Sequence, residues 1–387
     1  MNPLNGLTVV ALEQAVAAPF ATRQLADLGA RVIKIERPVV GDFARGYDET
    51  VQGMASHFVW LNRAKESVCL DLKSDQGRAA AQELAREADV FIQNLAPGAA
   101  ERLGLGAQDL RRTNPSLIHV SISGYGTGGP YSDKKAYDLL VQCEAGLLSV
   151  TGTNTEPAKV GISIADIASG MYAYTGILTA VIERHRTGEG ATIEVAMLEA
   201  LAEWMGYPLN YAMYGGTAPA RTGARHASIY PYGPFRCAGN ELVFLGLQNE
   251  REWSTFCVEI LEKPEMADDP RFIRNSRRVE NAEELRCEIE CTFAGRSAEE
   301  VASRLEGAGI ANALLRDMEG LEHHPQLLAR QRWRTYDSPV GPLNGLIPPV
   351  TFVGSEPRMG RVPAIGEHTQ AVLDEFGLVD AVLAHRA

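Results

Sequence analysis

The chain has 387 residues, of which 45% are hydrophobic and 22% are charged, and its formal net charge at pH 7 is −12. This length exceeds what one hydrophobic core usually holds, so we expect two domains. The acidic balance argues against nucleic acid as a partner. The chain has no run of eighteen apolar residues and no basic-then-apolar leader, so neither a membrane span nor a secretory signal is predicted.

The N-terminal third of the chain alternates β-branched runs with helical patterns. Strands are predicted over residues 7–13, 31–36, 67–72, 89–95 and 116–123. Strands separated by helices of this length indicate βαβ units and a parallel sheet. Ligands of such sheets bind beyond the carboxyl ends of the strands, so we expect the binding residues in the segments that follow them.

A glycine-rich stretch follows the fifth predicted strand. It reads GYGTGG and contains Gly124, Gly126, Gly128 and Gly129. The spacing matches G-x-G-x-x-G, but a dinucleotide fingerprint belongs in the first strand-to-helix turn and needs an acidic residue after the next strand. A loop over a site, or an ordinary turn, is therefore favoured over an NAD site.

Two aspartates stand where apolar helices begin. Asp138 opens the helix AYDLLVQ, and Asp166 lies among small and apolar residues in VGISIADIASGMYAYTGIL. An ionised carboxylate buried without a partner is costly. We expect Asp138 to cap its own helix, and a cap is also the simpler interpretation of Asp166. A carboxylate held ionised at a helix N-terminus also suits a nucleophile, so both roles stay open for Asp166.

The composition changes after residue 206, which suggests the domain boundaries. Residues 1–205 are expected to form a large domain, and the Gly-, Pro- and Tyr-rich residues 206–230 a loop and linker. Residues 231–325 read as a small domain of a strand and short amphipathic helices. Residues 326–387, with a Pro-broken strand and a final helix, are expected to return to the large domain.

Metal chemistry has little support in the sequence. The six cysteines are scattered, without paired C-x-x-C units, and H-E-x-x-H does not occur. His323 and His324 are adjacent and would lie on different faces of a helix. We therefore predict no metal site, and reduced thiols in the cytoplasm.

Single basic residues follow the predicted strands. Lys34 and Arg37 close the second strand, Lys73 closes the third, and Arg102 lies after the fourth. Each alone reads as solvated surface. Together, on one edge of a sheet, they would suit a nucleotide phosphate or pyrophosphate.

Several stretches, in order along nearly the whole chain, resemble the family III coenzyme A transferases of the formyl-CoA and carnitine CoA-transferase type. They include LNGLTVVALEQAVAAPFATRQLADLGARVIKIERP, DVFIQNLAPGAAERLGL and ADIASGMYAYTGILTAVIERHRTGEG. The resemblance implies an α/β fold with a Rossmann-like parallel sheet in the large domain and a smaller α+β domain. It also implies a homodimer of interlocked ring-like subunits.

The resemblance assigns roles to particular residues. Asp166 matches the catalytic aspartate of the family, and Gln14 matches a residue near the reacting thioester. The positions that match contacts to the CoA nucleotide are Arg37, Leu72, Lys73, Asn94 and Arg102. The sequence departs from the family at Ala96, where relatives often carry a larger or basic residue. It also lacks the glycine run of the formyl/oxalate branch, which argues against an oxalate substrate.

One position separates two activities within the family. Racemases of 2-methylacyl-CoA esters carry a histidine before the aspartate that opens the helix AYDLLVQ, whereas this chain has Tyr137 before Asp138. A tyrosine is a poor base at neutral pH, which favours a transferase. The string KKAYDLLVQCEAGLLSVTG further resembles the branch that uses mesaconate, itaconate, citramalate, malate and succinate.

The expected activity is transfer of CoA from an acyl-CoA donor, succinyl-CoA in the first instance, to a small dicarboxylic acid. Asp166 would form a mixed anhydride and then an enzyme–CoA thioester, with acyl-CoA as substrate and no tightly bound cofactor. Arg221, Arg225 and His226 are candidates for binding the distal carboxylate of the acceptor, and surface charge is the alternative for them. The alternative functions are a 2-methylacyl-CoA racemase or epimerase and a non-catalytic acyl-CoA-binding protein.

Overall fold

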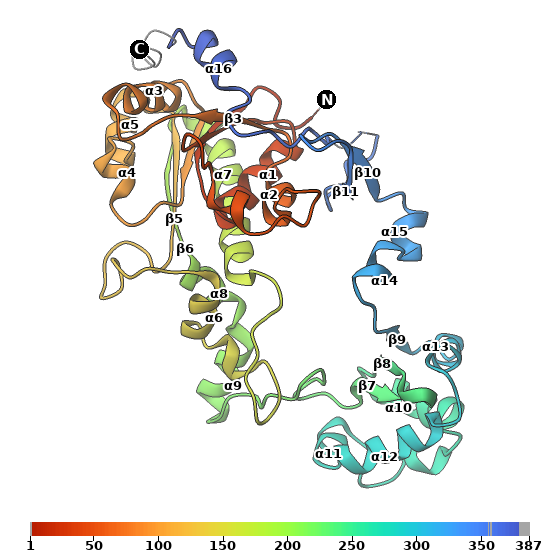
Figure 1. Ribbon diagram of the computed structural model, residues 1–387. Helices are drawn as coiled ribbons and strands as arrows, with labels where there is room; N and C mark the ends of the chain where they lie inside the picture. The colour runs from red at the N-terminus through yellow and green to blue at the C-terminus, as the bar shows by residue number, and fades with distance from the viewer. Residues whose placement is uncertain (1, 355, 357, 379–387) are drawn as a thin grey trace. The chain divides into compact units, whose positions relative to one another are not determined.

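The fold is seen in a computed structural model that describes residues 2–354, 356 and 358–378 (Figure 1). The chain divides into two compact units. The first unit runs to Gly146, takes in Val160–Gly206 and resumes at Leu327, and the second consists of Leu147–Lys159 and Tyr207–Gln326.

The first unit is built on a six-stranded sheet in which each neighbouring pair of strands is parallel. The strands lie in the order β3-β2-β1-β4-β5-β6, which is the order of Rossmann-type folds. The predicted parallel α/β sheet is thereby confirmed. The strands are β1 (Thr8–Leu12), β2 (Arg31–Glu36), β3 (Lys65–Cys69), β4 (Val90–Gln93), β5 (Ile118–Ser123) and β6 (Thr192–Ala196).

Helices cover both faces of this sheet (Figure 1). On one face α3 (Asp75–Arg86), α4 (Ala99–Arg102) and α5 (Ala107–Thr113) share a buried cluster with the strands. On the other face lie α1 (Ala17–Asp27), α2 (Ser56–Leu61) and the long α7 (Ile164–Thr187). Strands covered on both faces read as continuous apolar runs, which is why the sequence located them.

Helices α1 and α7 approach each other closely at Gly170. A Cβ at this position would lie 2.6 Å from the carbonyl oxygen of Ala17 and 3.2 Å from Cβ of Phe20. Glycine is therefore required for this approach. The contact fixes the N-terminal half of α7 against the start of α1, and Asp166 lies in the first turn of α7.

The first unit also contains helices and a hairpin that pack around the sheet and α7. Helices α6 (Asp138–Glu144) and α8 (Met197–Trp204) pack against α7. An antiparallel hairpin of β10 (Trp333–Tyr336) and β11 (Leu343–Leu346) follows. The segment before α16 (Thr369–Glu375) lies along β3, where the His368 N–H donates to Ser67 O (2.9 Å).

The second unit has its own sheet and core. Strands β7 (Tyr232–Arg236), β8 (Leu242–Gly246) and β9 (Ala311–Leu314) form an antiparallel sheet in that order. Trp253, Phe256, Phe272 and Phe293 are buried in one cluster. The helices of this unit are α10 (Glu250–Thr255), α11 (Asn275–Glu280), α12 (Ala282–Phe293), α13 (Ala298–Gly307) and α14 (Met318–Glu322). The prediction of a smaller α+β part is confirmed.

Two helices cross the unit boundaries, α9 (Gly206–Gly215) and α15 (Pro325–Ala329). The sequence predicted loop from residue 206, so the prediction is wrong for α9. Pro208 stands in the first turn, where a backbone N–H has no partner within the helix, and Leu209, Ala212 and Met213 favour helix. Across the described residues, no helix is long and apolar enough to cross a membrane.

Candidate active site

Asp166 is the third residue of α7 and is half-buried. Among the described residues, no group donates a hydrogen bond to its carboxylate. Burial, and secondly the negative charge of Asp138, raise the pKa of Asp166 from 3.8 to about 7. The carboxylate is therefore destabilised by its surroundings, which is unusual for a structural residue and typical of a chemical one.

The cap of α7 comes from another helix. Asp138 Oδ1 accepts hydrogen bonds from the backbone N–H groups of Ala165 (2.7 Å) and Asp166 (3.2 Å). The formal cap residue, Ser163, makes no side-chain capping bond within the described structure. The prediction that Asp138 caps its own helix is wrong, because its carboxylate accepts these two amides of α7 instead. The prediction that Asp166 caps α7 is also wrong, because Asp138 already occupies the amides that Asp166 would cap.

The other amides at the start of α7 are also occupied. The N–H of Ile164 donates to Ile162 O (2.8 Å), and the N–H of Ile167 donates to Ser163 O (2.9 Å). The helix terminus is thus satisfied without the Asp166 side chain. The expectation that this terminus holds Asp166 ionised is therefore wrong, since the pKa of Asp166 is raised rather than lowered.

Gln14 and Asn94 are brought together by the strand order. They follow the neighbouring strands β1 and β4, and the Gln14 N–H donates to Asn94 Oδ1 (2.8 Å). Asn94 Nδ2 in turn donates to Gln14 O (2.9 Å), and the Phe43 N–H donates to Gln14 Oε1 (3.2 Å). The Asn94 amide therefore braces the Gln14 backbone, and its proposed contact to the CoA nucleotide stays a prediction.

A buried network of charges lies beneath Gln14. Lys34 Nζ contacts Asp42 Oδ2 (2.7 Å) and Glu13 Oε1 (3.2 Å), and Lys65 Nζ contacts Glu13 Oε1 (2.7 Å). All four side chains are buried, so two cations face two carboxylates away from water. The prediction of Lys34 as a surface cation for phosphate is wrong. A lysine inside the apolar strand RVIKIE was the signal, because a buried charge requires partners.

This network also shapes the loop before α1. Asp42 Oδ1 accepts a hydrogen bond from the N–H of Ala15 (2.9 Å), whose φ of 61° is left-handed. Such a conformation is unfavourable for alanine and is kept only where the surroundings enforce it. Ala15 packs against the same apolar cluster as Ile167 and Met171 of α7. The loop that carries Gln14 therefore lies against the first turns of α7.

Sequence reasoning missed Tyr47. Burial, followed by the charges of Asp42 and Asp166 and then by Tyr137, raises the pKa of the Tyr47 phenol. Tyr47 is thus within electrostatic reach of the nucleophile candidate, and Tyr137 is within electrostatic reach of Tyr47. The sequence offered no signal for Tyr47, because only the fold brings its loop to the start of α7.

The predicted nucleotide-binding residues follow strands β2, β3 and β4, whose carboxyl ends share one edge of the sheet. The side chains of Arg37, Lys73 and Arg102 are exposed there, and Leu72 packs against the core. The Arg37 guanidinium lies 5.0 Å from the centroid of the Phe43 ring. This placement agrees with binding beyond the strand ends, and the individual roles stay predictions.

The GYGTGG stretch forms an irregular loop after β5. Gly126, Gly128 and Gly129 have φ values of +86°, +82° and +76°, which favour glycine. A Cβ on Gly124 would lie 2.1 Å from Cβ of Ala136, so the two ends of the loop touch. The loop follows the fifth strand and precedes Tyr137 and Asp138, which places it next to α6 rather than in a dinucleotide turn.

The three residues predicted for the acceptor carboxylate lie in the second unit, whereas Asp166 lies in the first. Arg221 Nε donates to Thr153 O (2.8 Å), and Arg225 forms an ion pair with Glu283 (2.7 Å). The His226 ring stacks on Tyr232 with centroids 5.3 Å apart. Each has a partner within its own unit, and their role toward the acceptor stays a prediction.

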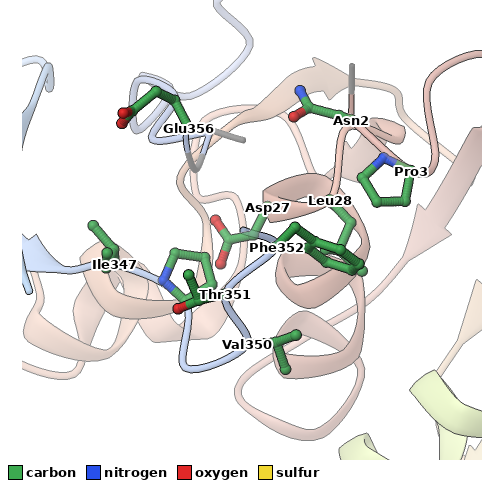
Figure 2. A pocket seen from close by; sticks show the side chains of 10 residues that line it. Asn2, Pro3, Asp27, Leu28, Ile347, Val350, Thr351, Phe352 and Glu356 are labelled. Atoms are coloured by element: carbon green, nitrogen blue, oxygen red, sulfur yellow. The ribbon is translucent and has the colours of Figure 1, made fainter. Parts of the chain in front are cut away.

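A small cavity of about 40 Å³ lies elsewhere in the first unit (Figure 2). It is bordered by the end of α1 and by residues 347–352, and it includes the Asp27 carboxylate, which Arg63 holds at 2.8 and 2.6 Å. It is therefore separate from the surroundings of Asp166. Over the described residues, no group of three or more His, Cys, Asp or Glu side chains could hold a metal ion.

Comparison with known proteins identifies the family. The sequence profile of CoA-transferase family III matches residues 4–369. The chain is 34% identical over 392 residues to acetyl-CoA:oxalate CoA-transferase of Acetobacter aceti, which covers 98% of this chain and 97% of that protein. It is 33% identical over 383 residues to succinyl-CoA:glutarate CoA-transferase of Homo sapiens, which covers 97% of this chain and 86% of that protein.

A solved structure agrees with these matches. The crystal structure of a CAIB/BAIF family protein from Brucella suis has a TM-score of 0.85 to this chain at 31% identity, covering 97% of this chain and 99% of the other. The resemblance drawn from the sequence is confirmed. The family profile and these matches show that the chain belongs to CoA-transferase family III.

Proposed function

We propose that the protein transfers CoA from an acyl-CoA donor to a small dicarboxylic acid, with Asp166 as the nucleophile. The observation that carries this proposal is the half-buried Asp166 carboxylate, whose pKa is raised to about 7. A carboxylate that burial and a neighbouring charge destabilise loses less on attacking an electrophile than a well-solvated one. At neutral pH a substantial fraction is ionised and able to react.

The reaction proceeds by exchange of activated acyl bonds. An Asp166 carboxylate oxygen attacks the donor thioester carbonyl, the C–S bond breaks, and a mixed anhydride and CoA thiolate result. The thiolate attacks the Asp166 carbonyl carbon, which forms an enzyme–CoA thioester and releases the donor acid as its carboxylate. The acceptor carboxylate then attacks the carbonyl carbon of this thioester and expels the CoA thiolate, which leaves a second mixed anhydride. The thiolate attacks the acceptor acyl carbon of this anhydride, so that the new acyl-CoA forms and the Asp166 carboxylate is regenerated. No net proton is consumed, and no nucleotide hydrolysis is needed.

The surrounding residues have separate tasks in this proposal. Gln14, held by Asn94 and Phe43, lies beside the thioester, and Arg37, Lys73 and Arg102 bind the CoA nucleotide at the strand ends. The GYGTGG loop limits access of water, which would hydrolyse the anhydride.

The substrates are proposed from the relatives. The human relative is named for succinyl-CoA and glutarate, and the Acetobacter relative for acetyl-CoA and oxalate. Both names pair an acyl-CoA donor with a dicarboxylate, and the two relatives are almost equally similar. The missing glycine run favours an acceptor longer than oxalate, of the glutarate, mesaconate or itaconate kind, with succinyl-CoA as donor. Arg221, Arg225 and His226 remain the candidates for its distal carboxylate.

A homodimer is part of the proposal. Met213 and Tyr214 of α9 are 63% and 83% exposed, and Leu139 and Leu140 of α6 are also exposed. Apolar faces of this kind usually become covered by a partner chain. We further propose a cytoplasmic enzyme without a tightly bound cofactor, in keeping with its free cysteine thiols. Light scattering at several protein concentrations tests the dimer.

The first experiment is mass spectrometry of the intact protein and of its proteolytic peptides after incubation with succinyl-CoA, before and after hydroxylamine. We expect a CoA adduct on the peptide that contains Asp166, which is lost with hydroxylamine and absent in Asp166→Asn. Asp317→Asn, the same substitution at an unrelated helix start, should still form the adduct. Failure to form an adduct with succinyl-CoA and acetyl-CoA would remove the nucleophile assignment. Exchange of the acyl α-proton with deuterium would then indicate a racemase.

A further inference from the structure

A pair of side chains on α6 holds the first turn of α7. Asp138 Oδ1 accepts the N–H groups of Ala165 and Asp166, and Gln142 Nε2 donates to Asp138 Oδ2 (2.6 Å). Gln142 is fully buried, and its Oε1 accepts the N–H of Val160 (3.0 Å). Each side-chain oxygen and nitrogen of this pair thus contacts the first turn of α7, the segment that leads into α7, or the other member of the pair.

This arrangement decides which carboxylate uses the amides at the helix start. In the absence of Asp138, the N–H groups of Ala165 and Asp166 would be open to a nearby acceptor, and a first-turn carboxylate is favoured at such a position. The Asp166 side chain would then gain hydrogen bonds, and its negative charge would be stabilised. A carboxylate stabilised in this way is a weaker nucleophile.

We propose that Asp138 is a positioning residue for the nucleophile: oriented by Gln142, it fixes the first turn of α7 and occupies the amides that would otherwise bind the Asp166 carboxylate. This inference rests on the proposed role of Asp166 and adds two residues that act through it. Asp138 does not contact the substrate in this scheme. It keeps the reacting group in place and available.

The electrostatics of the site support the proposal. The two causes of the raised pKa of Asp166 are burial and the charge of Asp138. The charge of Asp166 and the nearby Tyr137 are among the causes that raise the pKa of the Tyr47 phenol. The other titratable groups on the elements packed against α7 are not among the causes; these groups are Arg23 and Asp27 on α1, Cys143 and Glu144 on α6, His119 on β5, Glu194 on β6, and Glu199 and Glu203 on α8.

Two variants separate position from charge. Gln142→Leu keeps the Asp138 charge but removes the bonds that orient it. We expect kcat to fall by roughly tenfold or more, with little change in KM for acyl-CoA, because misplacement of a reacting group acts on the chemical step. Asp138→Asn removes the charge and turns one acceptor into a donor that faces Gln142 Nε2. Here we expect the acid limb of the kcat/KM profile to move to lower pH. A purely structural role would not move this limb.

The control is Asp317→Asn. Asp317 Oδ1 accepts the N–H of Gly320 (2.8 Å) at the start of α14, in the second unit. This variant should leave kcat and the acid limb as in the wild type. An unchanged limb in Asp138→Asn, together with an unchanged kcat in Gln142→Leu, would overturn the proposal while the CoA adduct on Asp166 still formed.

A second measurement does not depend on turnover. The pH dependence of unfolding should differ between the wild type and Asp166→Asn, and this difference should shrink when both proteins also carry Asp138→Asn. If the difference is the same with and without Asp138, the inference is wrong whether or not the protein transfers CoA. If the difference shrinks but no adduct forms in the wild type, the proposed function fails and the positioning of Asp166 stands.

Discussion

Replacing Asp166, the proposed nucleophile, should make the protein more stable. Asp166 carries a charge that its surroundings do not compensate, since burial raises its pKa from 3.8 to about 7. A carboxyl group with a folded-state pKa above its unfolded-state pKa weakens the fold. This loss begins as pH rises through the unfolded value and is complete above the folded value. Asp166→Asn removes the ionisation and keeps the shape, so it should remove the loss.

The magnitude follows from the two pKa values. At about 1.4 kcal/mol per pKa unit, the full loss above pH 7 is roughly 4 kcal/mol, and about half of it has already occurred by about pH 5.5. Contact of the half-buried carboxylate with water reduces these figures. We therefore expect the stability advantage of Asp166→Asn to grow by about 1–2 kcal/mol between about pH 5.5 and about pH 8.

The assay is urea unfolding of both proteins at the two pH values and one protein concentration, followed by circular dichroism. The difference in free energy of unfolding should favour Asp166→Asn at both values and increase with pH. Asp317→Asn should show no such gain. A difference that stays constant with pH, or that favours the wild type at about pH 8, would refute the argument that Asp166 is an uncompensated charge.

Three further predictions concern activity and packing. The value of kcat/KM for succinyl-CoA should fall as pH drops through about 7, because Asp166 must be ionised to attack, and a pH–rate profile that stays flat down to pH 5 would contradict this. Lys34→Met should lower the free energy of unfolding by about 3–5 kcal/mol, because it removes a cation from the two buried carboxylates of Glu13 and Asp42. The exposed control Lys73→Met should leave stability unchanged and raise KM. Similar urea midpoints for the two variants would contradict the burial argument. Gly170→Ala should destabilise the protein and slow adduct formation, since a Cβ there meets a backbone oxygen at 2.6 Å, while Gly176→Ala on the same helix, with a nearest contact of 3.4 Å, should be neutral or stabilising in thermal unfolding.

The sequence predicted the sheet well because its strands are continuous apolar runs between helices. Five of the strands of the large sheet lie where the β-branched runs stand. Boundaries were less accurate. Strand β3 covers Lys65–Cys69 rather than residues 67–72, because the chain turns after it, with the Ser74 N–H donating to Asp71 O (3.0 Å). Helix α9 was missed because glycine and proline at its start read as loop.

The sequence named candidate residues for the site but not the contacts between them. Asp166 was singled out by its apolar neighbours, yet its relation to Asp138 joins positions 28 residues apart. Gln14 and Asn94 are 80 residues apart and meet only because β1 and β4 are neighbours in the sheet. Lys34 was misplaced because it was interpreted as a cation at the strand end, although the apolar run around it indicated burial; its partners Glu13 and Asp42 could not be predicted from that run. Such contacts depend on strand order, which local patterns do not encode.

The carboxylates that support the fold differ from Asp166 in their surroundings. Glu13 and Asp42 each contact a lysine Nζ within 3.2 Å, and Asp42 also accepts the Ala15 N–H, so their charges hold the loop of Gln14 in one conformation. Ile167, the neighbour of Asp166, packs against the apolar cluster that Ala15 also contacts. The charge of Asp138, however, raises the pKa of Asp166 rather than lowering it. The fold provides partners for its structural charges but places a like charge beside Asp166, which agrees with the proposed reactive role of Asp166 and carries a cost in stability. Removing Asp166 should therefore abolish transfer and strengthen the fold, whereas removing Asp42 should weaken the fold and impair transfer together.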